Sequence, residues 1–472
     1  MTLDEFRDVD AIGQAELVRD GEVTALELVD AAIARIEAAR GLNAVICDLF
    51  AFARAEAAKP LPDGPLAGAP FLLKDLGGAL AGVPDRMGSV ALRDHVATTE
   101  PWLIGRYRAA GLVVCGKTNT PEWGNHCTTE PTLFGPTVNP WAPDRSPGGS
   151  SGGSAVAVAT GLVPLASGGD GTGSIRVPAS CCGVVGLKPR RGRMSFAPGA
   201  GDSLSGLVNL HGLTFSVRDC AALLDASAGV VAGDPYTAPP AATTFSEAAA
   251  SEPPPTRILM TADPPFGGTT DPEVRAAVES VGRLLVDLGH EVDAGAPDFD
   301  GDAVTDAVAV LHAISNVELH DLAAEHLGRA PREDEFEPSS WEMMREGFAT
   351  TGMQLQHAIG QVHAQGRRFA DGLAAHDVLL CPTLLTTLPP LGHLNQPRGS
   401  VRAFFETEFA TTGWTPMANV SGWAAISLPL GRTADGWPIG VQLMAEEESI
   451  LLALAAQLEQ ATGWERPVSA SA

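Results

Sequence analysis

Lysine is scarce in this sequence, and three of its lysines stand where a charge is unfavourable. Lys74, Lys117 and Lys188 each follow a short apolar run, in the segments FLLK, LVVCGK and VVGLK. A lysine at the end of a buried strand must pair with an anion or lose its proton. A neutral lysine is a general base, so both outcomes stay open for each of the three. Lys59, in the polar segment EAAKPLPDG, is expected at the surface.

Two glycine-rich segments also carry candidate chemistry: SPGGSSGGS (146–154) and SGGDGTGSIRVPAS (167–180). Neither contains the G-x-x-x-x-G-K-[ST] pattern of a phosphate-binding loop. The first leads directly into the apolar run SAVAVATGLVPLA, which argues against a flexible linker. Tight glycine turns beside buried elements are typical of an oxyanion site, with Ser174 as a candidate nucleophile. No G-x-S-x-G elbow is present, so a lysine is the alternative base.

The elements that must position these residues alternate between strands and helices. Apolar runs at 69–74, 112–117, 161–170 and 256–261 predict strands, and those at 425–431 and 436–445 predict a hairpin closed by TADG. Residues 23–41 predict a helix with a Thr24–Glu27 capping box and Gly41 at its C-terminal end. Residues 154–161 predict a buried helix, and 271–289 a further one that leads into a strand. The class is therefore α/β with a mixed sheet.

The domain organisation follows from these elements and from a change in composition. A Pro-, Ala-, Thr- and Ser-rich stretch at 235–255 shows no apolar period and is expected to be a surface connection. We therefore expect one domain over 1–472, with a helical part at about 1–60, a core at about 61–234 and a second half at 256–472.

Composition excludes several classes of partner. The formal net charge of −26 argues against nucleic acid and anionic membrane surfaces. No apolar run is long enough to predict a membrane span, and the acidic start MTLDEFRDVD predicts a cytoplasmic protein. The seven cysteines form no CxxC pair, so they are expected to be small buried hydrophobic residues rather than metal ligands or disulfides.

Taken together in their order along the chain, the motifs resemble the amidase signature family. They are LLKDL (72–76), GKTNTPEWGN (116–125), GGSSGGS (148–154), GSIRVPAS with CGVVGLKP (173–189), and the late NVSGWAAISLPLG and DGWPIGVQ. The resemblance covers nearly the whole chain. It implies a large mixed, twisted β-sheet covered by α-helices on both faces. It also implies a catalytic triad of Lys74, Ser150 after a cis peptide bond, and the nucleophile Ser174.

The same resemblance implies an oxyanion hole from the backbone amides of Gly171, Thr172, Gly173 and Ser174, with no metal and no cofactor. Thr172 stands where the family has glycine, and a β-branched residue does not readily adopt a positive φ. The shape of the hole is therefore an open question. Asp170 and Arg176 match the family pattern and are expected to form an internal ion pair that supports the turn.

Within the family, the segments QAELVRDGE, TTEP and SSWEM look similar to hydrolases of the 6-aminohexanoate cyclic dimer. That likeness implies substrate contacts from Asn125 and Ser315, where Ser315 replaces a cysteine of that group. A loop-capping role for Asn125 is the alternative. Trp123 and Trp414 are expected to pack in the core, with the lining of an apolar pocket as the alternative.

The function these observations predict is hydrolysis of small linear or cyclic amides through an acyl-enzyme. The partner is then a small-molecule amide substrate, and the resemblance makes a homodimer an expectation. Aryl-acylamidase or carbamate hydrolase (urethanase) activity is an alternative. A glutamine-hydrolysing amidotransferase subunit is another, and a catalytically silent binding protein is a third, disfavoured by the intact triad.

Overall fold

The computed structural model describes residues 5–467, and its centre is one eleven-stranded mixed sheet. The strand order is β1-β3-β2-β4-β6-β5-β10-β11-β9-β7-β8. The pairs β2–β3, β2–β4, β7–β8 and β7–β9 are parallel, and the remaining pairs are antiparallel. The strands are β1 (Val45–Asp48), β2 (Pro70–Lys74), β3 (Val113–Thr118), β4 (Leu165–Asp170), β5 (Val185–Lys188), β6 (Asn209–Thr214), β7 (Arg257–Met260), β8 (Glu291–Ala294), β9 (Val378–Pro382), β10 (Ala424–Arg432) and β11 (Pro438–Ala445).

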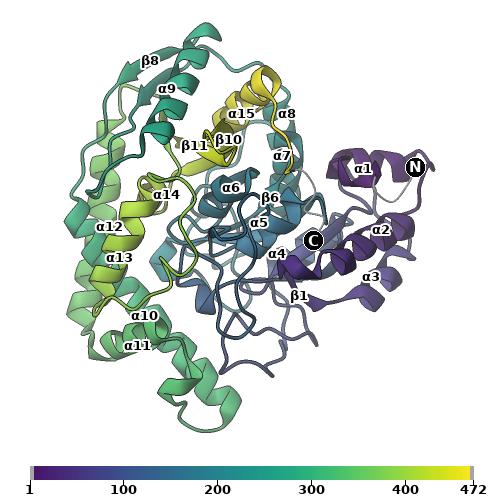
Figure 1. The fold of residues 1–472 in the computed structure, drawn as a ribbon, viewed down its shortest axis with the longest axis horizontal. Helices are drawn as coiled ribbons and strands as arrows, with labels where there is room; N and C mark the ends of the chain where they lie inside the picture. Colours follow the sequence, from purple (N-terminus) through teal and green to yellow (C-terminus); the bar gives the residue numbers. More distant parts are fainter. Residues whose placement is uncertain (1–4, 468–472) are drawn as a thin grey trace.

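The helices are arranged around this sheet (Figure 1). In that view the N-terminal helices, in purple, lie on the side opposite α10, α11, α12 and α13, in green. The α-helices are α1 (Ala11–Arg19), α2 (Ala25–Ala38), α3 (Phe50–Ala57), α4 (Trp102–Ala109), α5 (Gly152–Ala159), α6 (Arg176–Cys182), α7 (Val217–Ser227), α8 (Phe245–Ala249), α9 (Pro272–Asp287), α10 (Gly301–Leu327), α11 (Pro338–Ala349), α12 (Gly352–Gly372), α13 (Val401–Thr412), α14 (Thr415–Ser421) and α15 (Glu448–Thr462). Short 3₁₀ helices lie at Glu5–Arg7, Arg40–Leu42, Glu122–Gly124, Leu204–Gly206 and Glu333–Glu335.

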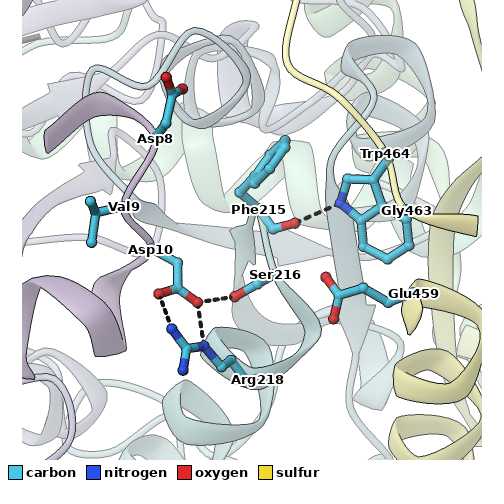
Figure 2. A pocket seen from close by; sticks show the side chains of 9 residues that line it. All are labelled: Asp8, Val9, Asp10, Phe215, Ser216, Arg218, Glu459, Gly463 and Trp464. Carbon is cyan, nitrogen blue, oxygen red and sulfur yellow. Dashed lines mark hydrogen bonds and ion pairs between the residues drawn. The ribbon is translucent and has the colours of Figure 1, made fainter. Parts of the chain in front are cut away.

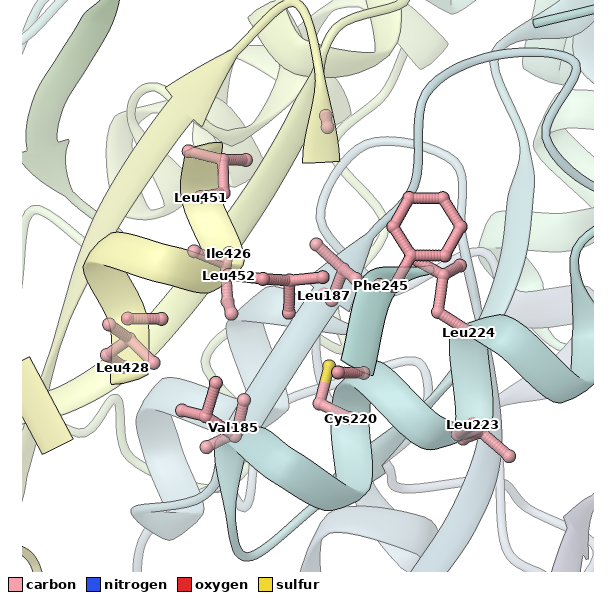
Figure 3. Packing of buried hydrophobic residues seen from close by; sticks show 14 of the residues in the cluster. Val185, Leu187, Cys220, Leu223, Leu224, Phe245, Ile426, Leu428, Leu451 and Leu452 are labelled. Carbon is pink, nitrogen blue, oxygen red and sulfur yellow. The ribbon is translucent and has the colours of Figure 1, made fainter. Parts of the chain in front are cut away.

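Both faces of the sheet are covered, because side chains alternate along each strand. On β2, Phe71 and Leu73 join a core shared with α7, α9 and α15, whereas Leu72 joins a core shared with α2 and α5. A third core packs β9 and β11 against α10, α12 and α13. Figure 3 shows part of the first core, where Val185, Leu187 and Ile426 of the sheet meet Leu451 and Leu452 of α15. This confirms the predicted α/β class with helices on both faces.

Most predicted elements are present. The Thr24–Glu27 capping box opens α2, but the helix ends at Ala38 with Ala39 as its C-cap, so placing the end at Gly41 was wrong. Gly41 lies instead in a separate 3₁₀ turn. The eight residues of α5 are all buried, as expected of a small apolar helix against a sheet.

The 235–255 connection is not wholly irregular. It contains α8, which a second capping box (Thr244 with Glu247) opens, and Phe245 of that helix is buried in the first core. Phe245 and Ala248 are buried, and Asp225 accepts from the first N–H groups of the helix, so tertiary contacts support a helix that the composition did not predict. No helix within residues 5–467 is both long and apolar enough to span a membrane.

Candidate active site

The candidate active site lies where three neighbouring strands end. Strand β2 lies between β3 and β4 and is parallel to both, so the three carboxyl ends meet at one edge of the sheet. These ends are Lys74 on β2, Thr118 on β3 and Asp170 on β4. The topology therefore brings together motifs that are far apart in the sequence.

Lys74 is hydrogen-bonded through Nζ to Ser150 Oγ at 2.7 Å, and only 2% of the residue is exposed. Its backbone N–H donates to Ser167 Oγ at 2.8 Å, which fixes the end of β2 against β4. Burial lowers the pKa of Lys74 to about 7, although the nearby Asp170 carboxylate pulls the other way. A substantial neutral fraction is thus available near neutral pH, as a base requires.

The segment that presents Ser150 has a specialised backbone. The Gly149–Ser150 peptide bond is cis, as the family resemblance implied. A Cβ on Gly149 would lie 2.3 Å from the Thr128 carbonyl oxygen, so only glycine fits there. The next residue, Ser151, donates its N–H to the Ser174 carbonyl oxygen at 3.1 Å. The two glycine-rich segments are therefore joined directly, next to the two serines of interest.

Ser174 lies in the turn between β4 and α6. It is 7% exposed and lines a cavity of about 290 Å³ that Lys74 and Ser150 also line. Its hydroxyl makes no hydrogen bond with any residue the structure describes. The hydroxyl is therefore available to a molecule in the cavity.

A buried ion pair supports this turn, as predicted. Arg176 Nε and Nη2 donate to the two oxygens of Asp170 at 2.9 and 2.7 Å, and neither residue is exposed. Burial alone would raise the pKa of Asp170, but Arg176 outweighs it and lowers the pKa to about 2. Asn419 donates to Asp170 Oδ1 at 3.0 Å, and the Ile175 N–H donates to Oδ2 at 3.1 Å. The carboxylate thus anchors the backbone on both sides of Ser174.

The four residues expected to form an oxyanion hole lie on this turn, and Gly171, Thr172 and Ser174 line the cavity. Thr172 does not adopt a positive φ; the unusual conformation falls on Gly173, with φ of 141°. A Cβ at Gly173 would also approach Thr415 Oγ1 to 2.7 Å. The Thr415 hydroxyl donates to the Thr172 carbonyl oxygen at 2.8 Å. The threonine in place of glycine therefore fits this turn without backbone strain.

Asn125 and Ser315 both line the cavity, but each already has partners in the protein. Asn125 and Asn316 exchange side-chain hydrogen bonds of 2.8 and 3.0 Å, and Asn125 Nδ2 also donates to Ser340 Oγ at 3.0 Å. Trp123 Nε1 donates to Ser315 Oγ at 3.0 Å, which leaves the Ser315 hydroxyl hydrogen free to donate. Asn125 thus makes the hydrogen bonds expected of a loop-capping residue and also lines the cavity.

Both tryptophans pack against hydrophobic clusters, as predicted, and Trp123 also lines the cavity. Trp414 is 2% exposed, donates through Nε1 to the Asp263 carbonyl oxygen and packs against Phe299. Trp123, in contrast, lines the cavity beside Ser315. It lies in the 3₁₀ helix Glu122–Gly124, which follows β3 at the edge where the strands end, so its side chain reaches the site.

Sequence reasoning missed several cavity residues. One wall is apolar, and another carries His312, Glu318 and Asp202. His312 and Glu318 lie three residues before and after Ser315 on α10, so a helical reading of 311–320 would have found both. Asp202 comes from an irregular loop and gave no signal. The apolar wall consists of Leu76, Pro101, Phe196, Leu204, Val208 and Leu210.

A second cavity lies near the N-terminus, between α1, the start of α7 and the end of α15 (Figure 2). Arg218 there pairs with Asp10 at 2.6 Å, and Asp10 also accepts from Ser216 at 2.8 Å. None of the residues predicted to do chemistry lines this cavity. The first cavity is therefore the candidate active site.

Comparison with known proteins agrees with this geometry. The amidase family profile matches residues 27–449. The chain is 40% identical to the 6-aminohexanoate-cyclic-dimer hydrolase of Paenarthrobacter ureafaciens, over 96% of this chain and 95% of that protein. It is 39% identical to the enzyme of the same name from Pseudomonas sp. (strain NK87), over 96% and 95% of the two chains.

Solved structures give the same result. A structure of 6-aminohexanoate cyclic dimer hydrolase complexed with substrate has a TM-score of 0.91 and 38% identity, covering 97% of this chain and 98% of that one. A bacterial aryl acylamidase of the amidase signature family has a TM-score of 0.85 and 26% identity, covering 96% of both chains. The chain therefore belongs to the amidase signature family and is a hydrolase of carbon–nitrogen bonds.

Proposed function

We propose that the chain hydrolyses small linear or cyclic amides, with Ser174 as nucleophile, Ser150 as proton relay and Lys74 as base. The observation that carries the proposal is the 2.7 Å contact between Lys74 Nζ and Ser150 Oγ, in the wall of a cavity that Ser174 also lines. A serine hydroxyl attacks a carbonyl only when a base takes its proton. The lowered pKa of Lys74 supports that role.

Acylation begins when neutral Lys74 takes the Ser150 proton and Ser150 takes the Ser174 proton. Ser174 Oγ attacks the amide carbon, and the carbonyl oxygen becomes an oxyanion. The backbone N–H groups of Gly171, Thr172, Gly173 and Ser174 stabilise that charge, and the loss of one such donor costs about 3–4 kcal/mol in comparable sites. The carbon–nitrogen bond then breaks as Ser150 gives a proton to the departing amine. Ser150 recovers a proton from the Lys74 ammonium, so Lys74 is neutral again before deacylation.

Deacylation uses the same relay. Water takes the place of the amine, gives its proton through Ser150 to Lys74, and attacks the Ser174 ester. The second oxyanion collapses, the acid leaves, and Ser174 regains its proton. The buried Asp170–Arg176 pair keeps the turn in place through both steps, because it anchors the backbone beside Ser174.

The substrate class rests on the likeness to the 6-aminohexanoate-cyclic-dimer hydrolases and on the apolar wall of the cavity. The purified enzyme should be assayed with a panel of cyclic amides, linear amides, aryl amides, carbamates and glutamine. Turnover of linear or cyclic amides by the protein alone supports the proposal. Exclusive turnover of aryl amides or carbamates would assign it to those alternatives, and glutamine hydrolysis only with a partner would indicate an amidotransferase subunit.

The nucleophile is tested by covalent labelling. An arenesulfonyl fluoride should add one label to the wild-type protein, located on Ser174 by peptide mass spectrometry. Ser174→Ala should remove both label and turnover. Ser203→Ala is the matched control, because Ser203 lines the same cavity but has no role in the relay. A label that persists in Ser174→Ala contradicts the assignment.

A further inference from the structure

One wall of the active-site cavity carries two carboxylates, one imidazole and one hydroxyl. Helix α10 contributes His312, Ser315 and Glu318, at a spacing that places them on one face of the helix. The loop before Leu204 contributes Asp202. The proposed mechanism uses none of these four side chains.

His312 is a neutral acceptor in this wall. The residue is 7% exposed, and its Nδ1 lies 3.0 Å from the Val308 carbonyl oxygen. A carbonyl only accepts, so Nδ1 carries the ring proton and Nε2 has a free lone pair. Burial lowers the pKa of His312 to about 4, which keeps the ring neutral at pH 7.

The Nε2 atom of His312 has no hydrogen-bond partner within residues 5–467. It is not sealed in the interior, in contrast to both ring nitrogens of His211. Because His312 lines the cavity, that open nitrogen faces the space a substrate would fill. An acceptor that faces a cavity and has no partner in the protein takes its donor from water or from a ligand.

Asp202 and Glu318 add negative charge to the same wall. Neither carboxylate has a hydrogen bond or an ion pair with any residue in the described part of the chain. Burial raises the pKa of Asp202, and the charge of Arg191 acts in the opposite direction without reversing it. The Arg191 guanidinium donates to the carbonyl oxygens of Gly206 and Asn419 rather than to Asp202. The pKa of Glu318 is raised by partial burial and by the negative charge of Asp202. Both acids line the same cavity, where Glu318 is exposed and Asp202 is half-buried.

The other charged residues of the cavity cannot balance these two. Asp170 is paired with Arg176, and Lys74 is hydrogen-bonded to Ser150 with a pKa of about 7. Among the residues that line the cavity, no cation is therefore paired with either carboxylate, and the His312 acceptor has no donor. A ligand that carries a cationic amine supplies a positive charge for the two carboxylates, and its N–H groups include a donor for the imidazole.

We propose that this wall selects amides that carry a protonated amine away from the scissile bond. The ammonium pairs with Asp202 and Glu318, and a substrate N–H donates to His312 Nε2. An amide that ends in a carboxylate is disfavoured by repulsion from the same two acids. This inference rests on the proposed amidase function, because it assigns a substrate class to that site.

The test compares amides that differ only in one end group: ammonium, methyl or carboxylate, on chains of equal length. One series carries the end group on the acyl part, and a second carries it on the amine part. Binding is measured by calorimetry with Ser174→Ala, and kcat/KM is measured with the wild-type enzyme. Binding decides the inference and turnover decides the proposed function, so the two can fail separately.

In at least one series, the ammonium amide should bind about tenfold more tightly than the methyl amide, and the carboxylate amide most weakly. The double substitution Asp202→Asn with Glu318→Gln, added to Ser174→Ala, should reduce that preference to within about twofold. Glu325→Gln is the matched control, because it removes an exposed charge from the same helix outside the cavity. Equal affinity for ammonium and methyl amides in both series would overturn the inference.

The hydrogen bond from the substrate to His312 is tested separately, by the binding affinity of His312 variants. His312→Phe, which keeps an aromatic ring beside Phe405, should weaken binding of every amide in the better-bound series by about tenfold. The ammonium preference should remain, because the carboxylates are intact. His312→Gln restores an acceptor and should recover part of the affinity. Unchanged binding in both variants would remove His312 from the account.

Discussion

Two lysines at neighbouring strand ends have opposite electrostatic environments. Lys74 closes β2, and Lys117 lies one residue before the end of the parallel strand β3. Both are buried. Lys117 Nζ lies 2.6 Å from Asp75 and 2.5 Å from Asp85. Within residues 5–467, Lys74 Nζ has one hydrogen-bond partner, the Ser150 hydroxyl at 2.7 Å.

The charge of each lysine is decided by its neighbours, because both lysines are buried. Burial lowers the pKa of both amines, but the two carboxylates around Lys117 outweigh it and raise its pKa above the usual value. The pKa of Lys74 falls to about 7. Asp75 follows Lys74 directly in the sequence, yet its carboxylate points to Lys117. The chain thus keeps one lysine as a structural cation and leaves the other available as a base.

Lys188 shows that a low pKa alone does not make a catalytic base. Burial also lowers its pKa well below the usual value, and its Nζ donates to the Pro189 carbonyl oxygen at 2.7 Å. Lys188 does not line the active-site cavity. A base therefore needs both the depressed pKa and contact with a group that loses a proton.

The largest expected effect is loss of activity in Lys74→Met. Without the base, kcat/KM should fall about a thousandfold or more, because general-base catalysis contributes about 10²–10⁴-fold and triad members act together. Lys188→Met is the matched control, since it removes another buried lysine of low pKa. Its kcat/KM should stay within about threefold of wild type. Comparable losses in the two variants would contradict the distinction between these lysines.

The next largest effect is on stability, where the substitution of Lys117 should cost more than the substitution of Lys74. Lys117→Met leaves Asp75 and Asp85 buried without a cation, so the free energy of unfolding should fall by about 3–5 kcal/mol. Lys74→Met leaves no buried charge unpaired and should change it by less than about 1 kcal/mol. Urea denaturation of the two variants checks both values. Equal destabilisation would show that Lys74 is also a structural cation.

The pH dependence of activity should follow Lys74. Only the neutral amine accepts a proton, so kcat/KM should fall about tenfold per unit as pH drops below the Lys74 pKa of about 7. Above that pKa the rate should level off. Lys117 titrates far from this range because its pKa is raised, so it adds no limb. A rate that is independent of pH from about 5 to about 8 would contradict a lysine base.

The smallest expected effect comes from Asp85→Asn. One of the two carboxylates of Lys117 is lost, but Asp75 still holds the ammonium. The free energy of unfolding should fall by about 1.5–3 kcal/mol, the value of one hydrogen bond to a charged group. The midpoint of the pH profile should not move, because Asp85 does not contact Lys74. A shifted midpoint would show that the two lysines are electrostatically coupled.

Local patterns predicted most of the fold because they reflect local physics. Apolar runs located β2, β3, β4 and the β10–β11 hairpin, and the capping box located the start of α2. Gly41 was misplaced as a helix end because 3₁₀ and α-helical turns share the same local signals. Strand order and register depend on contacts between distant segments, and the sequence alone did not specify them.

The site shows the same division. The sequence identified three lysines that follow apolar runs but could not distinguish them. Their partners do: Asp85 pairs with Lys117 and Ser150 accepts from Lys74, and neither partner is adjacent to its lysine in the sequence. The choice of Lys74 as the base came from the family resemblance rather than from the spacing of the lysines. His312 and Asp202 were missed, since only the folded chain brings them to one cavity.

The most direct test of the central claim is the rate at which a sulfonyl fluoride labels Ser174 as pH changes. This measures activation of the nucleophile without any assumption about the natural substrate. The labelling rate of the wild-type protein should rise about tenfold per pH unit and level off near pH 7, whereas Lys74→Met should react slowly at every pH. A wild-type rate that does not change through this range, or Lys74→Met that labels as fast as wild type, would contradict the account.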